Sequence, residues 1–193
     1  MMGTLKVGVW GDSIAAGAGA TNSIGWAQQI NCDVVNAVHG FGLHDIRLKL
    51  LNDLQVDCPE IVIIAAGIND ARWVQSNNEY TSTPEKVAEN LAEILDILEP
   101  KKCDTYVLEL TPIDERKTTP VSWDSDRFWN SEYVNYLNEE IIRMCKKRGV
   151  PLIPVRNQLN PSHIADGLHP NDSGHRIIAR VVLDTISGTS SPQ

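Results

Sequence analysis

The feature that most constrains the fold is an alternation of short apolar runs with longer amphipathic stretches, repeated five times. The apolar runs are residues 5–10, 34–35, 60–66, 105–110 and 152–155. Most are continuously apolar, which is typical of strands covered on both faces of a sheet. Helical spacing of apolar residues follows each run, at residues 23–30, 43–54, 84–98, 131–148 and 171–186. This alternation predicts a three-layer α/β/α fold with a central five-stranded parallel sheet.

Length and charge limit the class of protein. The 193 residues suit one domain, and no repeat or linker divides residues 1–193, although we expect the small, polar tail at 188–193 to be frayed. The 17 basic and 25 acidic residues give a net charge of −8, which disfavours nucleic acid and anionic membranes as partners. No run approaches the ~20 apolar residues of a membrane span.

The cysteines and the N-terminus predict a cytoplasmic protein. The residues before the first strand lack the basic and apolar regions of a signal peptide. The cysteines show neither C-x-x-C nor metal-like spacing, and we interpret them as reduced thiols: Cys32, Cys58, Cys103 and Cys145. We expect no metal site and no cofactor.

The first candidate site residue is Ser13, which follows the apolar run 5–10 at once. In open α/β sheets, ligands bind at the carboxyl ends of the strands, where this hydroxyl is expected to lie. A serine after a strand is also a common turn or cap residue. The adjacent Asp12 is expected to be structural, because neighbouring side chains on a turn point apart.

Asp166 and His169 form a second candidate pair near the other end of the chain. Three residues apart, they can lie side by side, so that the carboxylate holds the imidazole Nδ1–H and leaves Nε2 free as a base. The same stretch can begin a helix, with Asn171 or Asp172 as its cap.

Asn69 is the third candidate, close behind the apolar run 60–66. Its side-chain amide can donate a hydrogen bond to a developing oxyanion. An Asx turn or a helix cap is the structural alternative. Asp70 is expected to accept hydrogen bonds within the loop, and the remaining histidines are expected to be structural or solvated.

Together these stretches resemble the SGNH hydrolases, also called the GDSL esterase family. The matching blocks stand in the family's order: Gly11-Asp12-Ser13-Ile14, Gly67-Ile68-Asn69-Asp70 and Asp166-Gly167-Leu168-His169-Pro170. Isoleucine replaces the usual leucine in the first block. The resemblance implies a flavodoxin-like SGNH hydrolase fold and a catalytic triad of Ser13, His169 and Asp166.

The family's glycine block is the least regular. The resemblance implies an oxyanion hole formed by the N–H of Ser13, a glycine N–H and the Asn69 side chain. The usual spacing from Asn36 places that glycine at Phe41, and a shift of one residue reaches Gly40 or Gly42. We prefer Gly42, since the amphipathic stretch begins just after it, and keep Gly40 as the alternative.

The activity that the resemblance implies is that of a serine hydrolase, cleaving carboxylic esters of small or short-chain acyl groups through an acyl-enzyme. A carbohydrate O-deacetylase and an acyl thioesterase or lysophospholipase are the alternatives within the family. The expected partner is a small-molecule acyl ester. The irregular stretch 112–130 carries three aromatic residues that we expect to wall the acyl pocket: Trp123, Phe128 and Trp129. They could instead stack on a sugar ring or close the end of the core.

Three rival readings fit less well. Gly11-Asp12-Ser13-Ile14-Ala15 nearly matches the G-x-S-x-G of α/β-hydrolases, but that fold normally places its nucleophile after several strands. A nucleotide site at 17–19 lacks the third glycine of a dinucleotide fingerprint, and the chain has no Gly-Lys-Ser/Thr. A binding module without catalysis would not need Ser13, Asn69, Asp166 and His169 together.

Overall fold

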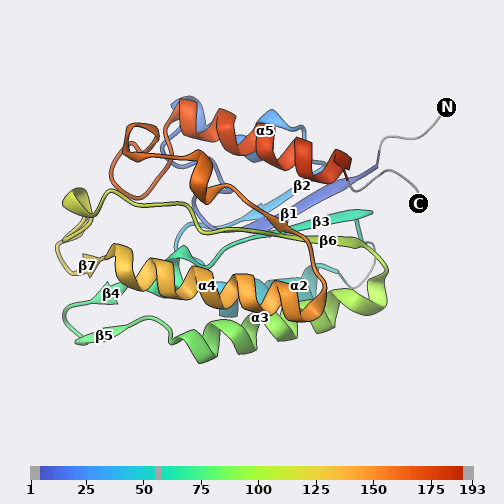
Figure 1. Cartoon of the computed structure of the whole chain (residues 1–193), viewed down its shortest axis with the longest axis horizontal. Helices are drawn as coiled ribbons and strands as arrows, with labels where there is room; N and C mark the ends of the chain where they lie inside the picture. The colour runs from blue at the N-terminus through green and yellow to red at the C-terminus, as the bar shows by residue number, and fades with distance from the viewer. Residues whose placement is uncertain (1–4, 55–57, 189–193) are drawn as a thin grey trace.

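The computed structural model describes residues 5–54 and 58–188, and its centre is a five-stranded parallel sheet (Figure 1). The strand order is β2-β1-β3-β6-β8, as expected of an α/β fold. The strands are β1 (Val7–Gly11), β2 (Val34–Ala37), β3 (Ile61–Ala65), β6 (Asp104–Leu108) and β8 (Leu152–Ile153). Every residue of β3 is buried, which agrees with a central strand covered on both faces.

Helices cover both faces of this sheet and complete the three predicted layers. They are α1 (Trp26–Gln29), α2 (Leu43–Asp53), α3 (Pro84–Leu98), α4 (Ser131–Arg148) and α5 (Asp172–Gly188). Figure 1 shows α5 above the sheet and α2, α3 and α4 below it. Helix α1 packs with α5, and α3 packs between α2 and α4. The three-layer prediction is therefore confirmed.

The first helix is shorter than the predicted 23–30. Asn22 and Ser23 have φ values of 56° and 55°, which a continuous helix does not permit. Gly25 is the N-cap, so only one turn of helix, α1, follows it. Trp26 is nevertheless fully buried, as the predicted apolar face requires.

The N-terminal caps of α3 and α4 differ in how well the sequence predicts them. Thr83 caps α3 by accepting a hydrogen bond from the Lys86 N–H at 3.3 Å, as its sequence indicates. For α4 the predicted cap, Ser131, is wrong. Asn130 is the cap and accepts from the Tyr133 N–H at 2.8 Å, while Ser131 is the first helical residue.

The loops that follow β3 and β6 contain a small second sheet that the sequence analysis did not predict. Its strands are β4 (Trp73–Val74), β5 (Glu79–Tyr80) and β7 (Arg127–Phe128), in the order β5-β4-β7. Both pairings are antiparallel, and Trp73 lies opposite both Tyr80 and Phe128. The irregular stretch 112–130 is thereby anchored to the loop that follows Asn69.

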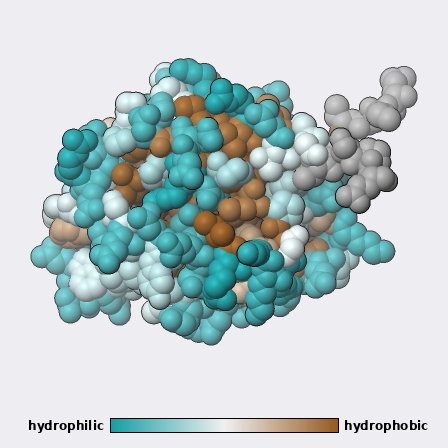
Figure 2. Space-filling model, viewed as in Figure 1, coloured by the Kyte–Doolittle hydropathy of each residue, from teal (hydrophilic) through white to brown (hydrophobic). Residues whose placement is uncertain are grey.

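The outer surface agrees with a layered fold. Figure 2 shows mostly hydrophilic side chains, with apolar ones visible mainly over α5 and in the band between α5 and α4. All four cysteines are free, as expected. Of the tail predicted at 188–193, Gly188 ends α5, and residues 189–193 lie outside the described part. Among the described residues, no helix combines the length and the apolar character that a membrane span requires.

Candidate active site

Ser13 lies just beyond the carboxyl end of β1, where the sheet topology predicts it. Parallel pairing aligns Gly11 with Ala65, and the Asp12 N–H donates to the Ala65 carbonyl at 3.2 Å. The chain then turns away from the sheet, and Ser13 is only 4 % exposed. The strand therefore delivers one hydroxyl to the sheet edge at which ligands bind in open α/β folds.

His169 meets Ser13 across 156 positions of sequence. Its Nε2 lies 3.0 Å from the Ser13 Oγ, and its Nδ1 lies 2.7 Å from the Asp166 Oδ2. With Nδ1 protonated and bonded to the carboxylate, Nε2 is unprotonated and faces the hydroxyl. This is the tautomer that a general base requires.

The Asp166 carboxylate is held in its ionised form by the turn that it begins. Partial burial opposes ionisation, but hydrogen bonds from the His169 ring and from the N–H groups of His169 and Leu168 outweigh it, so the pKa of Asp166 lies below its ordinary value. The two backbone bonds measure 2.8 and 3.0 Å. Asp166 can therefore orient the imidazole and stabilise its protonated form.

Helix α5 holds the loop that follows Ser13. Asp172 accepts from the Thr21 N–H and Oγ1–H, both at 2.7 Å. The fully buried His175 contacts the Ala18 carbonyl through Nε2 at 2.9 Å and accepts from the Trp26 N–H through Nδ1. Burial lowers the pKa of His175, so its neutral form is favoured. The structural role expected for His175 is therefore confirmed.

Asn69 reaches the same edge from β3. It lies in a 3-10 turn, Ile68–Ala71, and is 4 % exposed. Its Nδ2 donates to the Phe41 carbonyl at 3.0 Å. An amide nitrogen carries two hydrogens, so this bond fixes the side chain and leaves a second N–H to donate.

The two candidate glycines differ in what their N–H groups do. The Gly42 N–H donates to the Asp45 Oδ2 at 2.9 Å, as part of the cap of α2. Within the described ranges, the N–H groups of Gly40 and Ser13 donate to no other residue. Gly40 lines the pocket at Ser13 and has a φ of 84°, a conformation that favours glycine. The geometry therefore favours Gly40, the alternative, over the preferred Gly42, because the Gly42 N–H is already bonded to Asp45.

Two further carboxyl groups lie buried near the site. Asp70 accepts from the Leu43 N–H at 2.9 Å and occupies the space that a side chain at residue 42 would fill. Asp12 accepts from the Ile14 N–H at 2.9 Å. Burial raises the pKa of Asp70 to about 6 and that of Asp12 to about 7. Asp70 accepts a hydrogen bond in the loop as expected, and the bond to the Ile14 N–H agrees with the structural role expected for Asp12.

A small pocket of about 120 Å³ opens at these groups. Trp123 and Trp129 line it, as predicted; the Trp123 ring centroid lies 5.5 Å from that of His169, and Trp129 donates to the Ile68 carbonyl at 2.8 Å. Phe128 does not line it, contrary to expectation. Side chains alternate along β7, so Arg127 faces the pocket and Phe128 pairs with Trp73.

Three further residues line this pocket although no pattern in the sequence indicated it: His39, Arg127 and Leu168. Arg127 lies in β7, which pairs with β4, and this pairing brings it to the pocket. A strand of two residues is too short to show a periodic pattern in the sequence. Its side chain also forms an ion pair with Asp124 at 2.7 Å. Of the residues that the structure describes, no three His, Cys, Asp or Glu side chains form a group that could hold a metal ion.

Comparisons with known proteins agree with this geometry. A model of the GDSL-like Lipase/Acylhydrolase family matches residues 9–177. No curated protein matches by sequence. Among solved structures, the lipase/acylhydrolase from Enterococcus faecalis has a TM-score of 0.78 at 18% identity, and the alignment covers 98% of this chain and 99% of that one.

Two further solved structures are described as an acetyl xylan esterase and an acetyl-xylooligosaccharide esterase. The acetyl xylan esterase AlAXEase has a TM-score of 0.74 at 18% identity, with coverage of 94% of this chain and 100% of that one. An acetyl-xylooligosaccharide esterase from Geobacillus Stearmophilus has a TM-score of 0.71 at 17% identity, with 94% of each chain covered. At these identities the likeness establishes the fold.

The buried Asp12 generates a test of stability against pH. Its pKa rises from 3.8 to about 7 on folding, so between these values the folded state binds more protons, and the free energy of unfolding falls as the pH rises. The variant Asp12→Asn lacks this loss. Relative to wild type, we expect it to be more stable at about pH 8.5 than at about pH 4.5 in urea unfolding.

Asp172→Asn is the matched control. Hydrogen bonds from Thr21 lower the pKa of Asp172, so it is ionised in both states over this range, and its stability difference from wild type should stay constant. A difference for Asp12→Asn that is equally independent of pH would contradict the assignment.

Proposed function

Because the chain belongs to the GDSL-like lipase/acylhydrolase family, we propose that it hydrolyses carboxylic esters of small or short-chain acyl groups, with Ser13 as nucleophile. The observation that carries this proposal is the unbroken chain of contacts from Asp166 through His169 to Ser13, at 2.7 and 3.0 Å. A nucleophile bonded to a base that a third group orients is the arrangement that acyl transfer requires.

The reaction proceeds in two halves. His169 Nε2 takes the proton of Ser13 as the Oγ attacks the ester carbonyl, and Asp166 stabilises the imidazolium that forms. His169 then protonates the leaving alcohol, which leaves an acyl group on Ser13. Water, activated by the same imidazole, attacks the acyl-enzyme and releases the acid.

Three donors support the tetrahedral oxyanion in this proposal. They are the N–H of Ser13, the N–H of Gly40 and the second N–H of the Asn69 amide. The two backbone groups have no other acceptor among the described residues, and the Phe41 carbonyl fixes the Asn69 side chain. Donors that are fixed before the reaction need not reorganise as charge develops.

Pocket size favours a short acyl group. The volume of about 120 Å³ is small for a substrate site, since ligand pockets commonly measure about 300–1,000 Å³. Buried Trp129 and Leu168 form part of its wall, so a long chain has no continuous apolar channel within this pocket. Acetyl and its near homologues fit best.

The first test is the hydrolysis rate across p-nitrophenyl esters from acetyl to palmitoyl. We expect the highest kcat/KM for the shortest acyl chains and no rate above background for Ser13→Ala. A maximum at long chains would favour the thioesterase or lysophospholipase alternative. A rate that survives in Ser13→Ala would overturn the choice of nucleophile.

Asn69→Ala tests the oxyanion hole. Loss of one preorganised donor typically costs about 2.7–4 kcal/mol, so kcat should fall by roughly 10²–10³-fold with little change in KM. Asn52→Ala, on the exposed side of α2 and bonded to the Leu48 carbonyl, is the control and should retain full activity. A fall of less than about tenfold in Asn69→Ala would exclude this donor.

A carbohydrate O-deacetylase is the second candidate, and Trp123 favours it. This side chain is 47 % exposed and lies beside His169, so its open face is available to the alcohol half of a substrate. Apolar faces of sugar rings pack on such aromatic surfaces. Two proteins with this fold are described as esterases of acetylated xylan or xylooligosaccharides.

Trp123→Ala separates the two candidates. If Trp123 holds a sugar ring, kcat/KM for acetylated xylooligosaccharides should fall about tenfold, since one aromatic contact is lost, whereas the rate on methyl acetate should change little. Equal effects on both substrates would remove the support for the deacetylase.

A further inference from the structure

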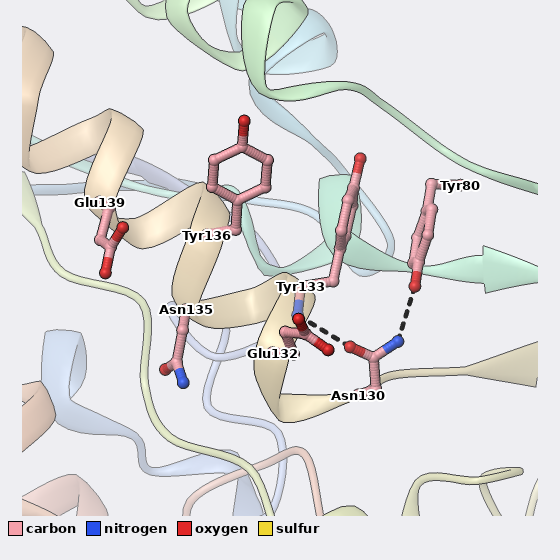
Figure 3. A pocket seen from close by; sticks show the side chains of 7 residues that line it. All are labelled: Tyr80, Asn130, Glu132, Tyr133, Asn135, Tyr136 and Glu139. Atoms are coloured by element: carbon pink, nitrogen blue, oxygen red, sulfur yellow. Dashed lines mark hydrogen bonds between the residues drawn. The ribbon is translucent and has the colours of Figure 1, made fainter.

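A second and larger cavity, of about 390 Å³, lies along the first two turns of α4. We name it the tyrosine groove. Its lining, drawn in Figure 3, consists of Tyr80 of β5 and a set of residues of α4 and its cap: Asn130, Glu132, Tyr133, Asn135, Tyr136 and Glu139. None of these residues lines the pocket at Ser13.

The aromatic part of the groove is rigid. The rings of Tyr80 and Tyr133 stack with centroids 3.5 Å apart and an interplanar angle of 14°. Asn130 donates to the Tyr80 hydroxyl at 2.7 Å, and the Tyr133 hydroxyl donates to the Ser82 carbonyl at 2.8 Å. Figure 3 shows these two rings edge-on, with Asn130 bonded to the Tyr80 hydroxyl and to the main-chain N–H of Tyr133. Little side-chain entropy remains to be lost on binding.

Tyr136 is the ring that remains open. It is 48 % exposed and meets the ring of Tyr133 edge to face, with centroids 6.4 Å apart. In Figure 3 it stands beside the stacked pair and presents its face. An exposed aromatic face next to a rigid aromatic stack is a surface on which a flat, partly apolar ring can pack.

The polar part of the groove consists of hydrogen-bonding groups without a basic side chain. Glu132 and Glu139 are exposed, stand about 10 Å apart along the helix axis, and pair with no other side chain among the described residues. The Asn135 side-chain oxygen accepts from Arg156, which leaves its amide hydrogens available. Carboxylates accept hydrogen bonds and repel anions, so this lining suits a neutral ligand rich in hydroxyl groups.

We propose that the tyrosine groove is a carbohydrate-binding site for a neutral oligosaccharide. A sugar ring packs on Tyr136, and its hydroxyl groups bond to Glu132, Asn135 and Glu139. A cation can pack on a single ring face, but the aromatic cages that recognise quaternary ammonium ligands direct several ring faces at one point. Here Tyr80 and Tyr133 cover each other's faces, so the arrangement favours the sugar.

The groove and the pocket at Ser13 are lined by neighbouring residues of one segment. Residues 127–130 separate the two sites: Arg127 and Trp129 line the catalytic pocket, and Asn130 lines the groove. The two sites are therefore joined by one short segment of the chain. The groove itself needs no catalysis, so its binding can be tested independently of the proposed function.

The experiment is native gel electrophoresis of the Ser13→Ala protein in gels that contain unsubstituted xylan, galactomannan or hydroxyethylcellulose. We expect at least one polysaccharide to retard it. Adding Tyr136→Ala should weaken the affinity for the polysaccharide, measured from the retardation, about tenfold. Tyr136→Phe should preserve it. Leu183→Ala, which truncates an exposed apolar side chain on α5, should leave it unchanged.

Each other outcome overturns the proposal. If none of the neutral polysaccharides retards the protein, the groove does not bind a neutral oligosaccharide. Retardation that Tyr136→Ala leaves intact places the sugar elsewhere, for instance at Trp123. Quenching of tyrosine fluorescence by tetramethylammonium, without any effect of the polysaccharides, would identify a site for organic cations. Thermal unfolding of each variant verifies that a lost effect does not reflect a lost fold.

Discussion

The parallel register between β1 and β3 is the constraint on which the site depends. Because Gly11 lies opposite Ala65, both strands end at the same level, and the turns that follow bring Ser13 and Asn69 to one edge of the sheet. A shift of register by one residue would turn every side chain of one strand to the opposite face. Every residue of β3 is buried, so such a shift would force the side chains on both of its faces to repack.

Buried carboxyl groups shape the loops around the site at a cost in stability. Asp70 joins the start of α2 to the turn that carries Asn69, and Asp12 closes the turn that carries Ser13. Burial raises the pKa of both groups, so their ionised forms are disfavoured in the folded protein. Each carboxylate replaces part of its lost hydration with backbone N–H groups. These carboxyl groups give the loops a defined shape, but they lower the free energy of unfolding at neutral pH.

The sequence predicts the parts of the molecule that depend on local pattern. Strands, long helices and the Asp166–His169 turn follow from apolar spacing and from residues three apart, and the structure confirms them. The sequence could not distinguish Gly40 from Gly42 as the candidate donor, because the difference depends on which of the two N–H groups is bonded to the side chain of Asp45. The small sheet was missed for a similar reason. Two-residue strands are defined by their partners, and so the exclusion of Phe128 from the pocket followed from pairing that no local pattern records.

The contact between Ser13 and His169 also has a consequence for synthesis on the ribosome. Ser13 is made among the first residues, and Asp166 and His169 follow only after more than 150 further positions have been added. Chains generally fold in the order in which they emerge, so β1, β2 and β3 can assemble long before α5 exists. The contact between Ser13 and His169 can therefore form only after the C-terminal part of the chain has been made.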